Sequence, residues 1–262
     1  MRGIRFLWRY CLIATSLLLQ PVTTSAQFAP RIRAARPSVT MGTYTVGKDV
    51  LQWQSGMRWQ EFYHDQVDQK IFQYQTVLRW GFAEQWEMSS VINYQRDWIK
   101  QPPTRLIHNG INTLRLGIRH HLFEKEGFVK AAALQGRFWI PFQQKDFNQD
   151  KIGGRIMASV SYRLGKKRQL ITNGGWRWAG TTTSKATPFF SLRFSHPLTP
   201  DLSLIFDYFS RFDPFEPDYA IGLGYHFSPL WKMDIAFGDL GESQFSNRYI
   251  EIGWTTRLDW RG

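Results

Sequence analysis

Apolar and polar residues alternate along the chain with a period of two, and this pattern constrains the fold more than any other feature. In the stretch 250–260 one face takes Ile250, Ile252, Trp254, Thr256, Leu258 and Trp260, and the other takes Glu251, Gly253, Thr255, Arg257 and Asp259. Successive side chains of a β-strand point to opposite faces, so the alternation predicts a strand between two different environments. Twelve such segments recur, at 51–59, 72–80, 86–94, 112–122, 129–140, 154–163, 169–178, 188–196, 202–211, 218–227, 232–238 and 250–260.

The charged residues of these segments fall on the face opposite the bulky apolar side chains. A charge that faces lipid at the middle of a membrane costs about 2–4 kcal/mol, so lipid would enforce this segregation on every strand. The pattern predicts an all-β protein: a transmembrane, antiparallel, up-and-down β-barrel of about 12 strands. Fourteen charged residues are placed in its lumen, where they would set selectivity: Arg58, Arg79, Glu87, Arg115, Arg119, Arg137, Arg155, Arg163, Arg177, Arg193, Asp207, Asp234, Glu251 and Arg257.

A secreted soluble barrel or sandwich is the alternative, with the apolar face as its core. Aromatic residues make up 16% of the chain, so such a core would be unusually crowded. Tryptophans fall instead toward the ends of the segments, as an aromatic girdle at the membrane interface requires. They are Trp53, Trp59, Trp80, Trp86, Trp176, Trp178, Trp254 and Trp260.

Short and long connections alternate between the segments. Tight turns such as "GFAE" at 81–84 and "PLTPD" at 197–201 alternate with longer polar stretches such as "QRDWIKQPPTRLIHNG" at 95–110. Outer-membrane barrels have short turns on the periplasmic side and long loops outside. An even number of strands returns both termini to the periplasm, which predicts a barrel at 50–262 and a periplasmic lead-in at 27–49.

The N-terminus is typical of an export signal at 1–26. Three arginines precede an apolar stretch at 11–19 and a small-residue cleavage site at 24–26. The single cysteine, Cys11, lies in this segment, so the mature chain would contain no thiol. Removal of the signal lowers the formal charge from +12 to +9. No stretch has the 18 to 20 consecutive apolar residues of a membrane-spanning helix.

Several motifs resemble a family of outer-membrane channels named for the MetA pathway of phenol degradation. They are "RPS" at 36–38, "GTYTVGKDVLQWQSGMRW" at 42–59, "VLRWGFAEQWEM" at 77–88, "GINTLRLGIRHHLF" at 110–123, "YAIGLGYHFSPLWKMDIAFG" at 219–238 and the final "IEIGWTTRL". The chain departs from the family at Ala35, where an acidic residue is expected, and in its Trp-Arg-Gly end. The resemblance implies a twelve-stranded barrel that passes small, often hydrophobic, molecules and has no catalytic residues.

The sequence contains no recognisable catalytic or metal site. No G-x-S-x-G motif occurs, and the adjacent His120 and His121 must point to opposite faces of one strand. "DFNQDK" at 146–151 begins like a calcium loop, but Lys151 replaces the glycine of the sharp turn and Met157 replaces the bidentate Glu. The stretch therefore indicates a solvated loop, as does "HDQVDQ" at 64–69. We expect no cofactor and no metal.

Ten arginines and four acids are expected in the lumen, so an open lumen would favour anions. Alternatively, the arginines pair with Glu87, Asp207, Asp234 and Glu251 and brace a closed barrel, because about twelve strands leaves either possibility open. We expect a narrow passage for small solutes in the outer membrane of a Gram-negative cell. A non-transporting anchoring barrel is the alternative, and an outer-membrane hydrolase comes last. Expected partners are outer-membrane lipid, the barrel-insertion machinery and an unidentified solute, but not nucleic acid.

Overall fold

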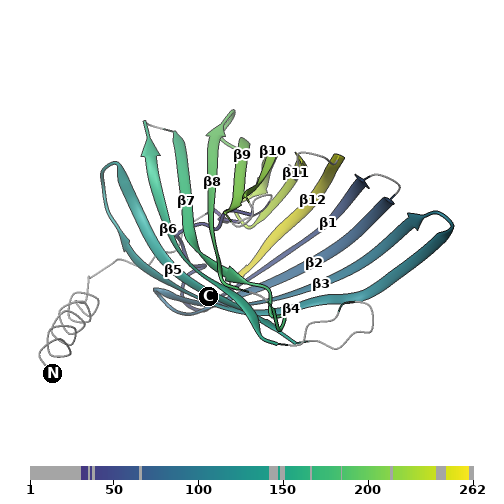
Figure 1. The fold of residues 1–262 in the computed structure, drawn as a ribbon. Coiled ribbons are helices and arrows are strands. Elements are labelled where there is room, and N and C mark those ends of the chain that lie inside the picture. Colours follow the sequence, from purple (N-terminus) through teal and green to yellow (C-terminus); the bar gives the residue numbers. More distant parts are fainter. Residues whose placement is uncertain are drawn as a thin grey trace, which may run out of the picture.

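The computed structural model is a closed antiparallel barrel of twelve strands (Figure 1). It describes residues 31–259 except 35, 37–38, 65–66, 142–146, 148–150, 166, 184, 213–214 and 240–245, so the predicted signal at 1–26 lies outside the described residues. All twelve predicted strands are confirmed. Their bounds are β1 Val50–His64, β2 Val67–Ala83, β3 Trp86–Gln101, β4 Thr104–Glu124, β5 Val129–Ile140, β6 Gly153–Leu164, β7 Arg168–Trp178, β8 Thr187–Pro197, β9 Leu202–Phe212, β10 Phe215–Ser228, β11 Trp231–Asp239 and β12 Ser246–Asp259.

Each strand pairs with its neighbours in the sequence, and β1 pairs with β12 to close the ring. The closing pair runs in continuous register from Val50↔Asp259 to Tyr63↔Ser246. Closure removes the free sheet edges that strands cannot expose to hydrocarbon. In the part of the chain that the structure describes, no helix is long and apolar enough to cross a membrane.

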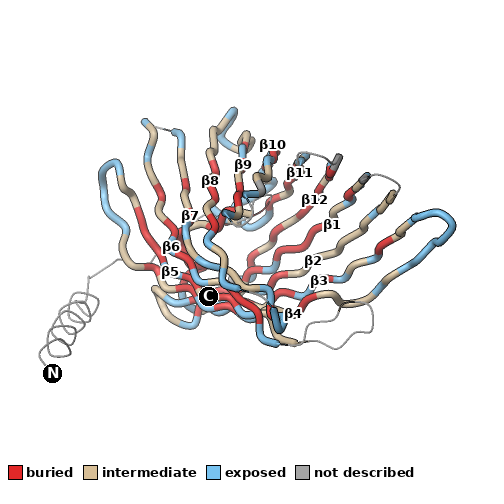
Figure 2. The backbone as a smooth tube through the Cα atoms, in the orientation of Figure 1, coloured by how far each residue is buried: buried red, intermediate tan, exposed pale blue. Residues whose placement is uncertain are grey.

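Burial alternates along the strands as the sequence pattern predicts (Figure 2). On β3, Trp86, Met88 and Ile92 are 37%, 49% and 46% exposed on the outer face, whereas Glu87 and Val91 on the inner face are 1% exposed. This arrangement places the apolar surface on the outside of the ring and the charges within it, the reverse of a soluble β-barrel.

Aromatic side chains form a belt on the outer face near the short-turn end. Phe82 lies between Trp80 and Trp86, with ring centroids 6.0 and 6.4 Å apart. On the β10–β11 hairpin, Phe227 stacks on Trp231 at 4.5 Å. Trp260 lies outside the described residues. The belt supports the girdle that the tryptophan positions predict.

The connections differ from the prediction at one end of the barrel. The stretches 64–69 and 95–110, predicted as loops, are mostly strand: β1 and β2 are separated by residues 65–66, and β3 and β4 by Pro102 and Pro103. A tilted strand needs only about 9–11 residues to cross a membrane, so β3 and β4, of 16 and 21 residues, extend beyond it. Their hairpin projects furthest from the ring and is exposed (Figures 1 and 2).

Candidate functional site in the barrel lumen

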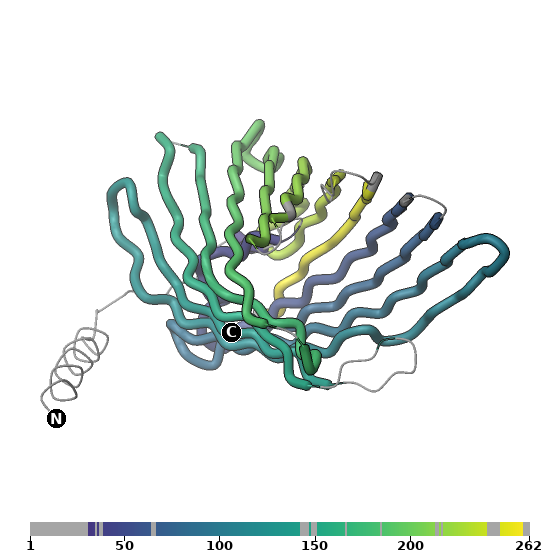
Figure 3. The backbone as a smooth tube through the Cα atoms, in the orientation of Figure 1, coloured from purple at the N-terminus to yellow at the C-terminus, as the bar shows by residue number. Residues whose placement is uncertain are grey.

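The described part of the lead-in, within 31–49, runs inside the ring of strands (Figure 3). It enters at the short-turn end, where the N–H of Ile32 donates to the carbonyl of Pro229 at 2.8 Å. It reaches the middle of the barrel, where the N–H of Met41 donates to Asn173 Oδ1 at 2.7 Å. It then returns to the short turns, and the Thr45 hydroxyl donates to the carbonyl of Glu84 at 3.1 Å. The residue pattern of the lead-in did not indicate this path.

Arg36 attaches the lead-in to the last two strands of the barrel. Its Nη2 lies 2.8 Å from Glu251 Oε1, and its Nε lies 3.6 Å from Asp234 Oδ1. The guanidinium rests on Gly56 of β1 and Gly253 of β12, which are cross-strand partners. A Cβ at either glycine would overlap it. These two glycines therefore make the space that Arg36 occupies.

The other two acids predicted for the lumen, Asp207 and Glu87, also hold the lead-in. The N–H of Val39 donates to Asp207 Oδ2 at 2.7 Å, and the Thr40 hydroxyl donates to Asp207 Oδ1 at 2.6 Å. Glu87 Oε2 accepts from the N–H of Val46 at 3.0 Å. All four acids predicted for the lumen thus contact the lead-in, in addition to any partners on the strands.

An apolar cluster adds to this attachment. Met41 packs with Met157 of β6, Phe189 of β8 and Phe209 of β9, all at most 7% exposed, and Val39 lies against them. Phe189 and Phe209 stack with their centroids 5.8 Å apart. Inward-facing apolar side chains are not expected in a water-filled lumen, and here they bury the hydrophobic residues of the lead-in.

Tyr44 fixes the returning end of the lead-in. Its carbonyl accepts from Arg119 Nη1 at 2.8 Å and from Arg79 Nη2 at 3.3 Å. Its ring stacks on His121 at 5.7 Å, and its hydroxyl donates to Glu124 at 3.2 Å. Burial raises the pKa of the Tyr44 hydroxyl to about 12, so the ring stays neutral at physiological pH.

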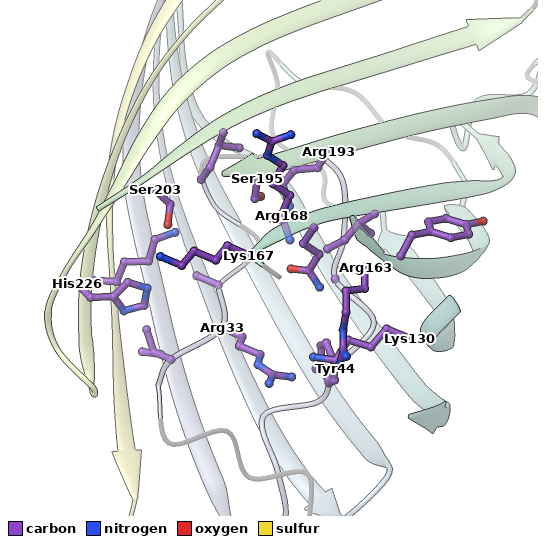
Figure 4. A pocket seen from close by; sticks show the side chains of 18 of the residues that line it. Arg33, Tyr44, Lys130, Arg163, Lys167, Arg168, Arg193, Ser195, Ser203 and His226 are labelled. Carbon is purple, nitrogen blue, oxygen red and sulfur yellow. The ribbon is translucent and has the colours of Figure 1, made fainter. Parts of the chain in front are cut away.

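On the short-turn side of the lead-in lies a cavity of about 340 Å³ (Figure 4), here called the inner cavity. Figure 4 shows Lys167, from the β6–β7 turn, reaching toward His226 of β10. Among the described residues that line this cavity there is no Asp or Glu. The lining cations are Arg33, Arg79, Arg119, Lys130, Arg163, Lys167, Arg168, Arg193 and Lys232.

On the opposite side of the lead-in lies a second cavity of about 350 Å³, here called the outer cavity. Its only acid among the described lining residues is Glu251, which Arg36 and Arg58 already neutralise, the latter at 2.6 Å. Amide side chains from β1 to β4 form one part of its wall. Its lining cations are Arg36, Arg58, Arg79, Arg115, Arg137 and Arg155.

The fourteen residues predicted for the lumen separate into three groups. Nine of them line the two cavities: Arg79, Arg119, Arg163 and Arg193 the inner one, and Arg58, Arg79, Arg115, Arg137, Arg155 and Glu251 the outer one. Glu87, Asp207 and Asp234 hold the lead-in instead. Arg177 and Arg257 line neither cavity. Arg79 also pairs with Glu87 at 2.6 Å, one of the bracing pairs considered as the alternative.

Other cations of the lumen were missed. Lys232 is 6% exposed and faces inward with Asp234, two residues along the same strand, so the period-two rule could have found it. Lys130 sits where the pairing of β5 and β6 shifts by one residue between Val129 and Ala131, and such a bulge breaks the rule. Arg33 and Arg36 belong to the lead-in, which has no period to read.

Two histidines follow their predicted orientation. His120 stacks on Trp86 at the outer face with centroids 4.1 Å apart, and His121 is buried inside beside Thr43, whose carbonyl lies 2.8 Å from its Nδ1. Within the described ranges, no group of three or more His, Cys, Asp or Glu could hold a metal. Asp146, Asn148 and Asp150 of the calcium-loop candidate lie outside these ranges.

Comparisons with known proteins agree with the geometry of the barrel. A crystal structure of an outer membrane channel from Pseudomonas putida F1 is similar, with a TM-score of 0.65 and 8% identity over 87% of this chain and 100% of that one. The NanC porin is similar with a TM-score of 0.53 and 10% identity, over 78% of this chain and 100% of that one. The translocator domain of the autotransporter NalP from Neisseria meningitidis is similar with a TM-score of 0.52 and 13% identity, over 80% of this chain and 88% of that one. At these identities the likeness shows the fold alone.

No curated protein matches the sequence. Residues 34–258 match the family described as "Putative MetA-pathway of phenol degradation". The match covers most of the chain, including the motifs that carried the resemblance, and it confirms that resemblance. The chain belongs to this family.

Proposed function

We propose that the protein is an outer-membrane channel for passive passage of small anionic solutes, narrowed at its middle by the lead-in. The observation that carries this proposal is the position of the four acids that the sequence predicts for the lumen. Each contacts the lead-in. Among the described residues, the two cavities on either side of the lead-in are lined by many cations and by one acid, Glu251, which Arg36 and Arg58 neutralise.

The physical basis is the field of these cations in a confined space. A cavity lined by one sign of charge with low-dielectric walls concentrates the opposite ion, because field lines are focused into it. Rings of Arg and Lys are the usual lining of anion pores. Family membership and the likeness to a channel and a porin support the outer-membrane setting.

An anchoring barrel without transport is the second candidate, and the position of the lead-in favours it. The lead-in is held by ion pairs, hydrogen bonds and apolar contacts at the middle of the lumen, where a solute would have to pass. Removal of the lead-in distinguishes the two candidates. A channel whose lumen is narrowed by this segment should conduct more without it, whereas an anchoring barrel should conduct no current in either form.

Conductance in planar bilayers tests the proposal. We expect the mature chain to conduct, with a reversal potential under a KCl gradient that shows preference for chloride. A variant lacking residues 31–46 should conduct several-fold more, because it loses the segment that divides the lumen. Preference for potassium would contradict the proposal, and absence of current from both proteins would favour the anchor. Incubation with phospholipid and ester substrates tests the hydrolase alternative.

A further inference from the structure

A row of arginines crosses the inner wall from β4 to β7. Arg137 and Arg155 are direct cross-strand partners, and so are Arg155 and Arg177. Arg137 also pairs with Gly117, two residues from Arg115 on the same face of β4. The row therefore places four guanidinium groups on four consecutive strands.

This arrangement is electrostatically unfavourable without a counter-ion. Like charges directly opposite each other on neighbouring strands repel, and a guanidinium stays protonated in proteins. No described Asp or Glu lies within ion-pair distance of Arg115, Arg137 or Arg155. Lipid does not compensate these charges either. All three arginines line the outer cavity, inside the barrel, where they do not contact lipid.

The hydrogen-bonding groups of the row point to a missing acceptor. The Nε atoms of Arg115, Arg137 and Arg155 are buried, and none has a hydrogen-bond partner among the described residues. Arg137 is only 7% exposed. A buried donor without a partner is unfavourable, and more so if it is charged, so three together favour binding of an acceptor.

The chemistry of the row defines the ligand. Guanidinium groups bind carboxylate and phosphate with two parallel N–H···O bonds each. Three adjacent guanidinium groups therefore match a solute with more than one anionic group. The adjoining wall, from β2 to β4, carries Gln73, Gln75, Asn93 and Asn112, whose amides can bind hydroxyl groups of such a solute.

We propose that the outer cavity is a binding site for a small polyanion, a polycarboxylate or a phosphate compound, held by Arg115, Arg137 and Arg155. Its volume of about 350 Å³ lies within the range of small-molecule sites, roughly 300–1,000 Å³. The inference deepens the proposed function and rests on it for the route by which the solute arrives. The binding itself does not require conduction.

Thermal unfolding of the full mature chain in detergent tests the site, with citrate and inorganic phosphate as separate probes and chloride as the monovalent reference. A ligand that binds the folded state raises the unfolding midpoint with its concentration. We expect citrate or phosphate to raise it at concentrations at which chloride has no effect. The probe with the greater effect tells polycarboxylate from phosphate. No shift with either probe would overturn the proposal.

Two substitutions localise the site. Arg137→Gln and Arg155→Gln should weaken the response to the probe at least tenfold, whereas Arg105→Gln, on the exposed hairpin of β3 and β4, should leave it unchanged. Without the probe, the first two variants should unfold at or above the midpoint of the unsubstituted protein, because each removes repulsion. A purely structural arginine would give a lower midpoint. An equal response in all four proteins would overturn the assignment.

Current recordings separate failure of this inference from failure of the proposed function. If citrate binds and no current flows in any protein, the binding site is supported and the channel function is contradicted. If chloride is conducted and neither probe binds, the channel stands and the site does not. If both hold, the probe should block the current in the unsubstituted protein and not in Arg137→Gln.

Discussion

At the residue scale, Arg36 compensates two carboxylates at once, those of Glu251 and Asp234. Glu251 has a second partner in Arg58, but Asp234 is 4% exposed, and among the described residues its one ion pair is with Arg36. Removal of one partner from a buried ion pair leaves an uncompensated charge, which is far more costly than the pair itself is favourable. The attachment of the lead-in therefore depends heavily on one side chain.

The substitution Arg36→Met tests this dependence. We expect it to lower the free energy of unfolding by about 3–5 kcal/mol, the usual cost of breaking a buried pair, and to raise the bilayer conductance toward that of the variant without residues 31–46. Urea unfolding and current recordings measure the two effects. The matched control is Arg31→Met, whose pair with Asp201 is half exposed and should contribute at most about 1 kcal/mol. Equal effects of the two substitutions would show that the lead-in is held by other contacts.

At the element scale, the sequence predicted every strand but not how far each one runs. Alternation is strict where lipid imposes it, so the membrane part of each strand could be read from the sequence. Beyond the membrane the constraint is relaxed, and Leu106 and Ile107 are adjacent, apolar and 49% and 53% exposed. That stretch lacks the period that would have identified it as strand.

The exposed hairpin should be dispensable for the barrel. Replacement of residues 99–106 by Asn-Gly joins the cross-strand partners Trp98 and Ile107 through a two-residue turn and keeps their register. We expect the unfolding free energy to change by less than about 1 kcal/mol, because the removed residues face water. The same turn in place of residues 92–114, between Val91 and Arg115, cuts into the membrane part and should abolish the folded barrel. Heat-dependent mobility on a gel reports folding, and loss of the barrel in the first variant would contradict the prediction.

The lead-in was beyond the reach of sequence patterns for a different reason. Its attachments join positions far apart in the chain, such as Met41 and Asn173, which are 132 residues apart. Many of them use backbone groups, which every residue carries, so composition gives no signal. Gly56 and Gly253, on the inner faces of their strands, mark a close approach only once their pairing is known.

At the scale of the whole molecule, the outer surface of the barrel is apolar and faces lipid, whereas the inner surface carries the charged side chains. The exposed outer face carries Leu116 near the middle of the spanning part of β4, and the same strand carries Leu106 outside the membrane, each 49% exposed. The same substitution at these two equally exposed leucines therefore compares a side chain that faces hydrocarbon with one that faces water.

An arginine at each position measures this difference. Leu116→Arg should lower the free energy of unfolding from phospholipid vesicles by about 2–4 kcal/mol, because the charge enters the hydrocarbon region. Leu106→Arg should change it by less than about 0.5 kcal/mol, as surface substitutions do. Equal values for the two variants would contradict a membrane barrel, as would a mature chain that stays monomeric in solution without detergent.

The glycine pair beneath Arg36 also bears on assembly. Gly56 belongs to the first strand and Gly253 to the last, so the pocket that they form comes into existence only when the ends of the sheet meet. Glu251 and Asp234 lie on β12 and β11, so they too reach Arg36 only in the closed ring. Pairing of β1 with β12 and docking of the lead-in are consequently coupled. Before these two strands pair, the binding pocket for the Arg36 side chain does not exist.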